Sequence, residues 1–324
     1  MVPKAELHVH LECTVSPGRA RRLAARHGVR LPQACFGPDG GYRYVDFPDF
    51  LELTRVVGSC LRDERDYYDI TRDYLDAAAQ AGVVYQEMIF WPDLPRQNGF
   101  APEAALDAVE AAMAEAGAAG GPLCALQVVL VRHDGAEACE TTARWAAGLR
   151  RQSVRAVNLA GNEATHPPAQ FARAFAIARD AGLGIVIHAG EAAGPQSVRE
   201  ALSIPGVTRI GHGVRAVEDP ALVEELADRG VTLEICPGSN VMLGFYPDFA
   251  AHPLRRLHDA GVKVTLNSDD PPFFRTSLAA EYEIAARHFG FTEAELRGLT
   301  RNAVEAGFAT ATERVGLRER LGAN

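Results

Sequence analysis

A pair of histidines with one residue between them, His8 and His10, stands near the start of the chain. On an extended strand both side chains point to the same side, so two neutral imidazoles can chelate a first-row metal ion there. A third imidazole and one carboxylate would complete a zinc-type site with a position left for water, and His188 and Asp269 are the natural candidates. Nitrogen ligands of this kind favour zinc over magnesium or calcium, which prefer oxygen.

The residues that could bind this metal follow short apolar segments. Such segments alternate with longer amphipathic stretches, which predicts parallel strands connected by helices. The expected strands are 5–10, 83–90, 124–131, 154–160, 184–188, 207–211, 231–235 and 262–267. Eight such units fit an α/β fold made of a single (β/α)8 TIM barrel over residues 1–324. The carboxyl ends of barrel strands meet at one face, where the active site forms.

Each candidate residue also has a simpler interpretation. The histidine pair could be structural, and Asp269 with Asp270 could cap a helix that begins at Pro271. His212, which follows the sixth expected strand, could be a hydrogen-bonded core residue. Because all of these features lie at strand ends that converge in a barrel, a metal site is the better interpretation.

The segment between the first two expected strands is longer than the other connections. Residues 34–48 contain several Gly and Pro residues and are expected to form a loop, whereas 49–61 is apolar and helix-like. An insertion at this place lies over the mouth of a barrel, so we expect a lid-like segment. The alternative is a peripheral helix that packs on the barrel. After residue 268 the chain is expected to continue as extra C-terminal helices.

The composition is that of a globular protein, with 47% hydrophobic and 23% charged residues. The net charge is −9 and no Lys/Arg run stands out, so no nucleic-acid partner is expected. The six cysteines form no C-x-x-C pair and are expected to be reduced thiols. The N-terminal residues lack the apolar core of a signal peptide, and no uncharged apolar run reaches the ~18 residues of a membrane span. We expect a cytoplasmic protein without an obligate protein partner.

Several motifs of the chain resemble those of the adenosine/adenine deaminase family of metal-dependent amidohydrolases. They occur in the order found in that family and span roughly residues 3–285: PKAELHVHLE at 3–12, LAG at 159–161, HAGE at 188–191, RIGHG at 209–213, CPGSN at 236–240 and LNSDDP at 266–271. The resemblance implies a zinc-dependent aminohydrolase on a TIM barrel that deaminates an adenine-type purine.

The resemblance also implies residue roles. Glu191 would protonate N1 of the purine, and His212 would orient or deprotonate the hydrolytic water. Asp270 would hydrogen-bond N7, and the backbone amide of Gly161 would meet N3. One zinc ion per chain would be held by His8, His10, His188 and Asp269. Further contacts with the substrate are expected from Glu12 and Ser239.

Two related kinds of site are not supported. Binuclear amidohydrolases often use a lysine on the fourth strand, and 154–160 has none, which favours a single metal. The zinc site of cytidine deaminases needs H-x-E with P-C-x-x-C, a combination that this chain lacks.

Two positions depart from the family pattern. Cys13 stands where relatives usually have glycine, and its side chain could crowd the pocket or contact the substrate. A nucleophilic pair of Cys13 with a histidine is a further possibility, although the metal site already supplies a nucleophile. Asn162 stands where relatives often have aspartate, which could alter local hydrogen bonding.

The sequence says least about the group attached to N9 of the purine. Relatives that act on adenosine commonly place aspartate after the H-x-H-L run, within reach of the ribose 5′-hydroxyl, whereas this chain has Glu12. The short lid and the RIGHG motif favour adenosine or a close adenine nucleoside as the expected substrate. Alternatives are adenine, an N6-substituted adenine or aminodeoxyfutalosine. A phosphoesterase and a catalytically inactive binding barrel remain as other classes, but no basic cluster for phosphate lies near the strand ends, and the full ligand set opposes an inactive barrel.

Overall fold

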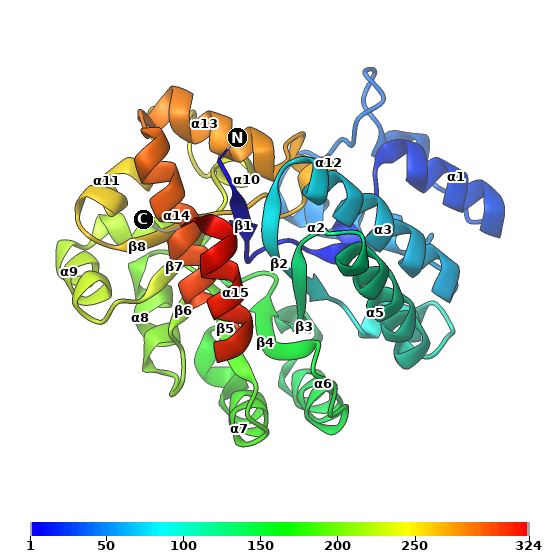
Figure 1. The fold of residues 1–324 in the computed structure, drawn as a ribbon. Coiled ribbons are helices and arrows are strands. Elements are labelled where there is room, and N and C mark those ends of the chain that lie inside the picture. Colours follow the sequence, from blue (N-terminus) through cyan, green and yellow to red (C-terminus); the bar gives the residue numbers. More distant parts are fainter. Residues whose placement is uncertain (1, 323–324) are drawn as a thin grey trace.

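The computed structural model describes residues 2–322. Eight strands form one parallel sheet in the order β1 to β8, and helices surround it (Figure 1). The strands are β1 (Lys4–Glu6), β2 (Val83–Phe90), β3 (Leu123–Val131), β4 (Val154–Ala160), β5 (Gly184–Ala189), β6 (Arg209–His212), β7 (Thr232–Ile235) and β8 (Lys263–Leu266). The expected strands all form, and the fold is the predicted TIM barrel.

The barrel closes between its first and last strands. Val9 pairs with Asp269 in parallel, and the backbone N–H of His10 donates to the Asp269 carbonyl over 3.0 Å. The first strand is shorter than the expected 5–10, because side chains replace its ladder bonds at Leu7. The Leu7 N–H donates to Oδ1 of Asn267 over 2.9 Å, and the Leu7 carbonyl accepts from Nε2 of Gln127 over 2.9 Å.

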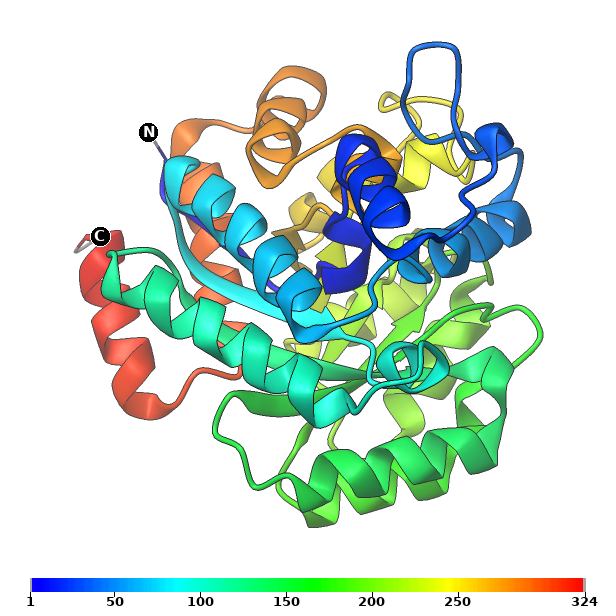
Figure 2. The same ribbon diagram turned by 90° about the vertical axis from the view of Figure 1, so that its right-hand side faces the viewer.

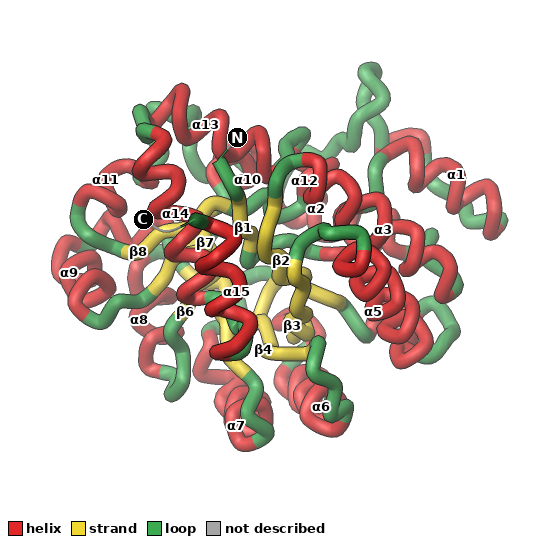
Figure 3. Tube along the Cα trace, in the orientation of Figure 1, coloured by secondary structure: helices red, strands yellow, loops and turns green. Residues whose placement is uncertain are grey.

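Helices cover the outside of the barrel and extend the chain beyond it (Figure 3). Asp219 caps α9, since its side chain accepts from the N–H groups of Ala221 and Leu222. The expected C-terminal helices follow β8. The helices are α1 (Pro17–His27), α2 (Phe47–Gly58), α3 (Glu64–Gln80), α4 (Asp93–Gln97), α5 (Pro102–Ala118), α6 (Ala136–Gly148), α7 (Ala172–Asp180), α8 (Pro195–Ser203), α9 (Pro220–Asp228), α10 (Pro237–Met242), α11 (Leu254–Asp259), α12 (Pro271–Phe274), α13 (Leu278–Phe289), α14 (Glu293–Ala306) and α15 (Ala311–Leu321).

The long insertion after β1 contains α1, an extended loop and α2. The loop projects from the body of the molecule, where the blue trace stands beside the yellow one (Figure 2). Asp39 in this loop pairs with Arg275 over 2.7 Å, which ties the loop to the segment after α12. The expected helix at 49–61 is α2, and the Phe50 ring on its inner face packs on Phe273 and Phe274. The insertion therefore lies over the carboxyl ends of the strands, as predicted.

The opposite end of the barrel is closed by Phe308, which follows α14. Its ring lies so close to β5 that a Cβ atom on Gly184 would stand 2.2 Å from it. Within residues 2–322, no helix is both long and apolar enough to cross a membrane.

Candidate active site

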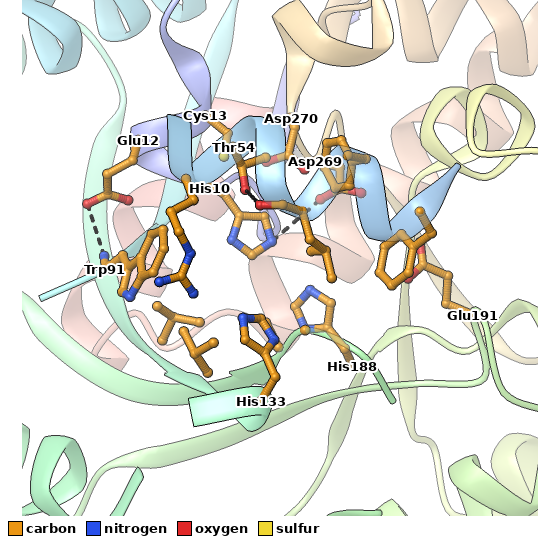
Figure 4. A pocket seen from close by; sticks show the side chains of 18 of the residues that line it. His10, Glu12, Cys13, Thr54, Trp91, His133, His188, Glu191, Asp269 and Asp270 are labelled. Carbon is orange, nitrogen blue, oxygen red and sulfur yellow. Dashed lines mark hydrogen bonds and ion pairs between the residues drawn. The ribbon is translucent and has the colours of Figure 1, made fainter. Parts of the chain in front are cut away.

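A cavity open to solvent lies at the carboxyl ends of the strands, with an empty volume of about 790 Å³ including its mouth. Its walls come from β3, β4, β5 and β6, from the segments that follow β1, β2 and β8, and from the inserted α2 (Figure 4). The lining residues are His10, Glu12, Cys13, Phe47, Phe50, Leu51, Thr54, Arg55, Trp91, Val129, Val131, His133, Ala160, Gly161, His188, Glu191, His212, Leu243, Asp269 and Asp270.

The four predicted metal ligands converge at the deep end of this cavity. Nitrogen atoms of His8, His10 and His188 lie within 4.8 Å of one another. Oδ1 of Asp269 lies 3.6 Å from Nε2 of His8 and 3.5 Å from Nε2 of His10. The side chains that the sequence places on three different strands are thus brought to one point.

These residues fit a zinc ion. Nε2 of His8 is buried and has no hydrogen-bond partner, which is costly unless another group satisfies it. Three imidazole nitrogens and a carboxylate oxygen are a donor set typical of zinc. His212 and Cys236 also lie near His8 and Asp269, and burial raises the pKa of the Cys236 thiol well above its usual range. That thiol is therefore a poor ligand in comparison with the imidazoles.

His212 and Asp269 have strained backbone conformations, which persist only where the surrounding structure holds them. The φ angles of His212 and Asp269 are 61° and 63°, in the left-handed region that non-glycine residues seldom occupy. Asp269 is held there by the barrel-closing bonds, since its N–H donates to the His8 carbonyl over 3.1 Å. This strain directs both side chains toward the metal-binding end of the cavity.

Two buried residues behind the ligands were not singled out from the sequence. Oε2 of Glu234 on β7 lies 3.0 Å from Nδ1 of His8, and Oδ1 of Asn158 on β4 lies 2.9 Å from Nδ1 of His188. Such partners orient a metal-binding imidazole and raise its basicity. The signal that could have found them is a polar residue inside an otherwise apolar strand.

Glu191 and His212 lie next to each other in the cavity wall, beside the ligands. Nε2 of His212 lies 3.5 Å from Oε1 of Glu191. Burial and the nearby Asp269 carboxylate raise the pKa of Glu191 well above its ordinary value, so this side chain is a carboxylic acid that can donate a proton. Burial lowers the pKa of His212 well below its ordinary value, so its imidazole is neutral.

A chain of hydrogen bonds behind His212 sets which of its nitrogens carries the hydrogen. The backbone N–H of Leu254 donates to Nδ1 of His252, so Nε2 of His252 is the donor to Oδ1 of Asn240, over 3.1 Å. The amide nitrogen of Asn240 then faces Nδ1 of His212 at 3.4 Å and donates to it. The hydrogen of His212 is left on Nε2, toward the cavity.

The segment that carries Glu191 is fixed by a buried carboxylate. Glu163 accepts from the backbone N–H groups of Gly190 and Glu191 over 2.9 and 2.8 Å. The neighbouring Asn162, one of the departures from the family pattern, makes only a local bond from its Oδ1 to the N–H of Ala164. The departure at 162 therefore leaves the Glu191 segment anchored.

Asp270 and Cys13 meet at the wall nearest α2. Oδ1 of Asp270 is buried without a hydrogen-bond partner, and burial with the adjacent Asp269 raises the Asp270 pKa well above its ordinary value. Burial and Asp270 raise the pKa of the Cys13 thiol, which therefore stays protonated. Ser239 is buried in α10 with its hydroxyl beside Asp269 and is not among the described residues that line the cavity, so its contact with the substrate stays a prediction. The neighbouring Asn240 contacts His212 and Glu191.

Glu12 lies at the end of the cavity away from Glu191 (Figure 4), and Gly161 lines the cavity beside His133. Gly161 has a φ of 100°, and a Cβ atom there would stand 2.8 Å from Nδ1 of His133, so only glycine fits. Oε1 of Glu12 accepts from the backbone N–H of Trp91 over 3.0 Å. Burial raises the pKa of Glu12 to about 7.

Known proteins resemble this chain over nearly its whole length. A family model described as adenosine deaminase matches residues 3–324. The chain is 49% identical over 305 residues to the adenine deaminase of Sinorhizobium medicae, covering 94% of each protein. It is 46% identical over 318 residues to that of Rhizobium leguminosarum bv. trifolii, covering 98% of each.

Solved structures agree with these sequence matches. The adenine deaminase from Arthrobacter aurescens has a TM-score of 0.92 at 30% identity, covering 99% of this chain and 98% of that one. An amidohydrolase from Burkholderia ambifaria with bound Zn has a TM-score of 0.90 at 26% identity, covering 99% of this chain and 89% of that one. The protein is thus an aminohydrolase that deaminates an adenine-type purine, and it belongs to the adenosine deaminase family.

Proposed function

We propose that the protein is a zinc-dependent adenine deaminase, which hydrolyses adenine to hypoxanthine and ammonia. The sequence alone favoured adenosine, with adenine as an alternative, but the relatives at 49% and 46% identity are adenine deaminases. The observation that carries the choice is Glu12, a buried carboxyl group at the end of the cavity away from Glu191.

Free adenine differs from adenosine at N9, where a hydrogen replaces the ribose. Glu12 and Trp91 stand at the end of the cavity away from Glu191 (Figure 4), so a purine with N1 directed toward Glu191 would have its N9 edge toward them. A carboxylate can accept more than one hydrogen bond, so Glu12 can accept from N9–H while it holds the Trp91 backbone. A ribose offers no donor at N9 and needs space at this position.

The side chains of the site have distinct chemical tasks. Glu191 delivers a proton to N1 and makes C6 electrophilic, in keeping with its raised pKa. His212 presents Nε2–H to the cavity, which supports orienting the attacking water over deprotonating it. Asp270 supplies a buried polar oxygen for the N7 edge, and the Gly161 amide faces N3.

His8, His10, His188 and Asp269 would hold one zinc ion. Zinc, when bound, lowers the pKa of a water ligand to about 7, so that hydroxide is available at neutral pH. The apolar side chains of α2 at the mouth, Phe47, Phe50 and Leu51, would exclude other water from the bound base.

The test is kcat/KM for adenine, adenosine, 2′-deoxyadenosine, N6-substituted adenines and aminodeoxyfutalosine, with ammonia release as the readout. We expect adenine to exceed adenosine by at least about tenfold, the scale on which a pocket discriminates by small steric differences. A preference for adenosine would overturn the choice of the free base and leave the deamination chemistry intact. Absence of ammonia from every purine would overturn the proposal as a whole.

A further inference from the structure

Buried polar side chains connect His8 to His188 beneath the cavity. They come from β2, β3, β4, β6 and β7, and none of them is more than 1% exposed or lines the cavity within residues 2–322. In order from His8 they are Glu234, Arg209, Glu87, Gln127 and Asn158. We call this set the polar relay.

On the His8 side, the direction of each bond in the polar relay follows from Arg209, which can only donate. Its Nε donates to Oε1 of Glu234 over 2.7 Å, and its guanidinium donates to Oε2 of Glu87 over 2.9 Å. Glu234, paired with this cation, is a carboxylate and only accepts. Because Oε2 of Glu234 lies 3.0 Å from Nδ1 of His8, the hydrogen of a neutral His8 is on Nδ1.

On the His188 side, the direction follows from Gln127. Its amide nitrogen donates to Oε2 of Glu87 over 2.8 Å and to the Leu7 carbonyl over 2.9 Å, which uses both of its hydrogens. Its oxygen therefore accepts from the amide nitrogen of Asn158, over 2.7 Å. The oxygen of Asn158 is left to accept from Nδ1 of His188 over 2.9 Å, so His188 also carries its hydrogen on Nδ1.

The middle of the polar relay, Arg209 and Glu87, is anchored at the floor of the barrel. The Arg209 guanidinium lies 4.3 Å from the centroid of the Phe308 ring. Oε1 of Glu87 accepts from the N–H of Phe308 and from the hydroxyl of Tyr85, each over 2.6 Å. With these partners Glu87 cannot turn away from Arg209 and Gln127 without leaving buried groups unsatisfied.

We propose that Arg209 and Gln127 are positioning residues that fix His8 and His188 in the tautomer with the lone pair on Nε2, toward the cavity. An imidazole binds a metal through its unprotonated nitrogen. By keeping the hydrogen on Nδ1, the polar relay therefore leaves Nε2 of His8 and of His188 free to bind the metal. His212 is in the opposite tautomer, which Asn240 sets, and presents Nε2–H to the cavity. The proposal rests on the metal site proposed above and assigns roles to residues remote from both metal and substrate.

The test is Gln127→Met, which keeps the approximate side-chain volume and removes the amide. Asn158 is then free to turn its nitrogen toward His188, which would move the hydrogen of His188 to Nε2. Long-range 1H–15N spectra of zinc-free protein labelled at histidine report the tautomer directly. We expect a substantial His188 population with hydrogen on Nε2, and zinc affinity, measured by chelator competition, lowered by about 10–100-fold.

Asn158→Asp in the Gln127→Met background should reverse both effects, because a carboxylate can only accept from His188. Asn158→Asp in the otherwise wild-type chain measures how much the added charge alone changes zinc affinity. The proposal requires that Asn158→Asp raise zinc affinity more in the Gln127→Met background than in the wild type. Thr300→Val, which removes a buried hydroxyl bonded to the Pro3 carbonyl, controls for lost stability and should leave tautomers and zinc affinity unchanged.

An unchanged His188 tautomer in folded Gln127→Met would overturn the proposal, as would failure of Asn158→Asp to restore it. Because the spectra are recorded without zinc or substrate, they decide the role of the polar relay even if the chain proves to act on another purine. A normal tautomer with weakened zinc binding would show a purely structural role for Gln127 and would also count against the proposal.

Discussion

Nε2 of His212 lies 3.5 Å from Oε1 of Glu191, and the two groups differ in what they can exchange with a substrate. Glu191 is a buried acid with a raised pKa, whereas His212 is a neutral imidazole whose hydrogen faces the cavity. A proton for the purine ring can therefore come from Glu191, and a hydrogen bond to the attacking oxygen can come from His212. These proposed roles would depend on Asn240, whose amide nitrogen lies 3.4 Å from both side chains.

Glu191→Gln tests the acid directly. The glutamine keeps the shape and a hydrogen-bonding amide but cannot deliver a proton, so kcat should fall by ~10²–10⁴ while fold and bound zinc are retained. His212→Ala should also lower kcat by orders of magnitude. The measurements are steady-state kinetics, circular dichroism and metal analysis on the same preparations. Near wild-type turnover in either variant would assign the role to another residue.

The convergence of His8, His10, His188 and Asp269 could be predicted, because it depends only on strand ends meeting at one face of a barrel. The polar relay could not, since it depends on which way buried side chains turn inside that barrel. Asn240 and Ser239 illustrate the limit. Both follow the seventh strand, but α10 begins at Pro237 and successive side chains then diverge around its axis, so Asn240 contacts Glu191 and His212 whereas the Ser239 hydroxyl lies beside Asp269.

The break in the first strand has a similar cause. An apolar and polar pattern over 5–10 predicts a continuous strand, but Asn267 and Gln127 take over the backbone bonds of Leu7. These partners are far away in the sequence, and no local pattern reveals them. The two histidines nevertheless reach the same metal-binding end of the cavity, because the chain pairs again at Val9 and His10.

Removal of a ligand should remove the metal. Purified protein is expected to carry close to one zinc per chain, and His8→Ala or Asp269→Ala should lose most of it, as measured by inductively coupled plasma mass spectrometry. His27→Ala is the matched control: its imidazole lies 2.8 Å from Asp66, in a separate cluster with Asp63 and Arg26 that does not line the cavity. Zinc retained in both ligand variants, or two metals per chain, would contradict the assignment.

Cys13→Gly should be tolerated. The thiol lines the cavity beside Asp270, and its raised pKa keeps it a weak nucleophile, so no covalent role is expected. Its removal opens space, and kcat/KM for purines with a larger N9 substituent should rise by up to about tenfold while that for adenine changes little. Cys13→Ser, similar in size, should behave like the wild type. Loss of adenine turnover in folded Cys13→Gly would reveal a direct role for the thiol.

Glu12→Asp should weaken the preference for the free base. The aspartate is one methylene shorter, so its carboxylate withdraws from the N9 edge of the purine and from the Trp91 N–H that now holds it at 3.0 Å. A misfit of this size is worth ~1–3 kcal/mol, which corresponds to a fall of roughly 10–200-fold in kcat/KM for adenine.

The same change vacates space where a ribose would lie, so kcat/KM for adenosine should stay level or rise, and the ratio of adenine to adenosine should shrink. Glu12→Gln separates length from charge, because the amide reaches as far as the carboxylate and its oxygen can still accept from Trp91. That variant should keep more of the adenine preference than Glu12→Asp. If the ratio of kcat/KM for adenine to that for adenosine is the same in Glu12→Asp as in the wild type, Glu12 does not recognise the N9 edge. Discrimination against the nucleoside must then come from the side chains of α2 at the cavity mouth.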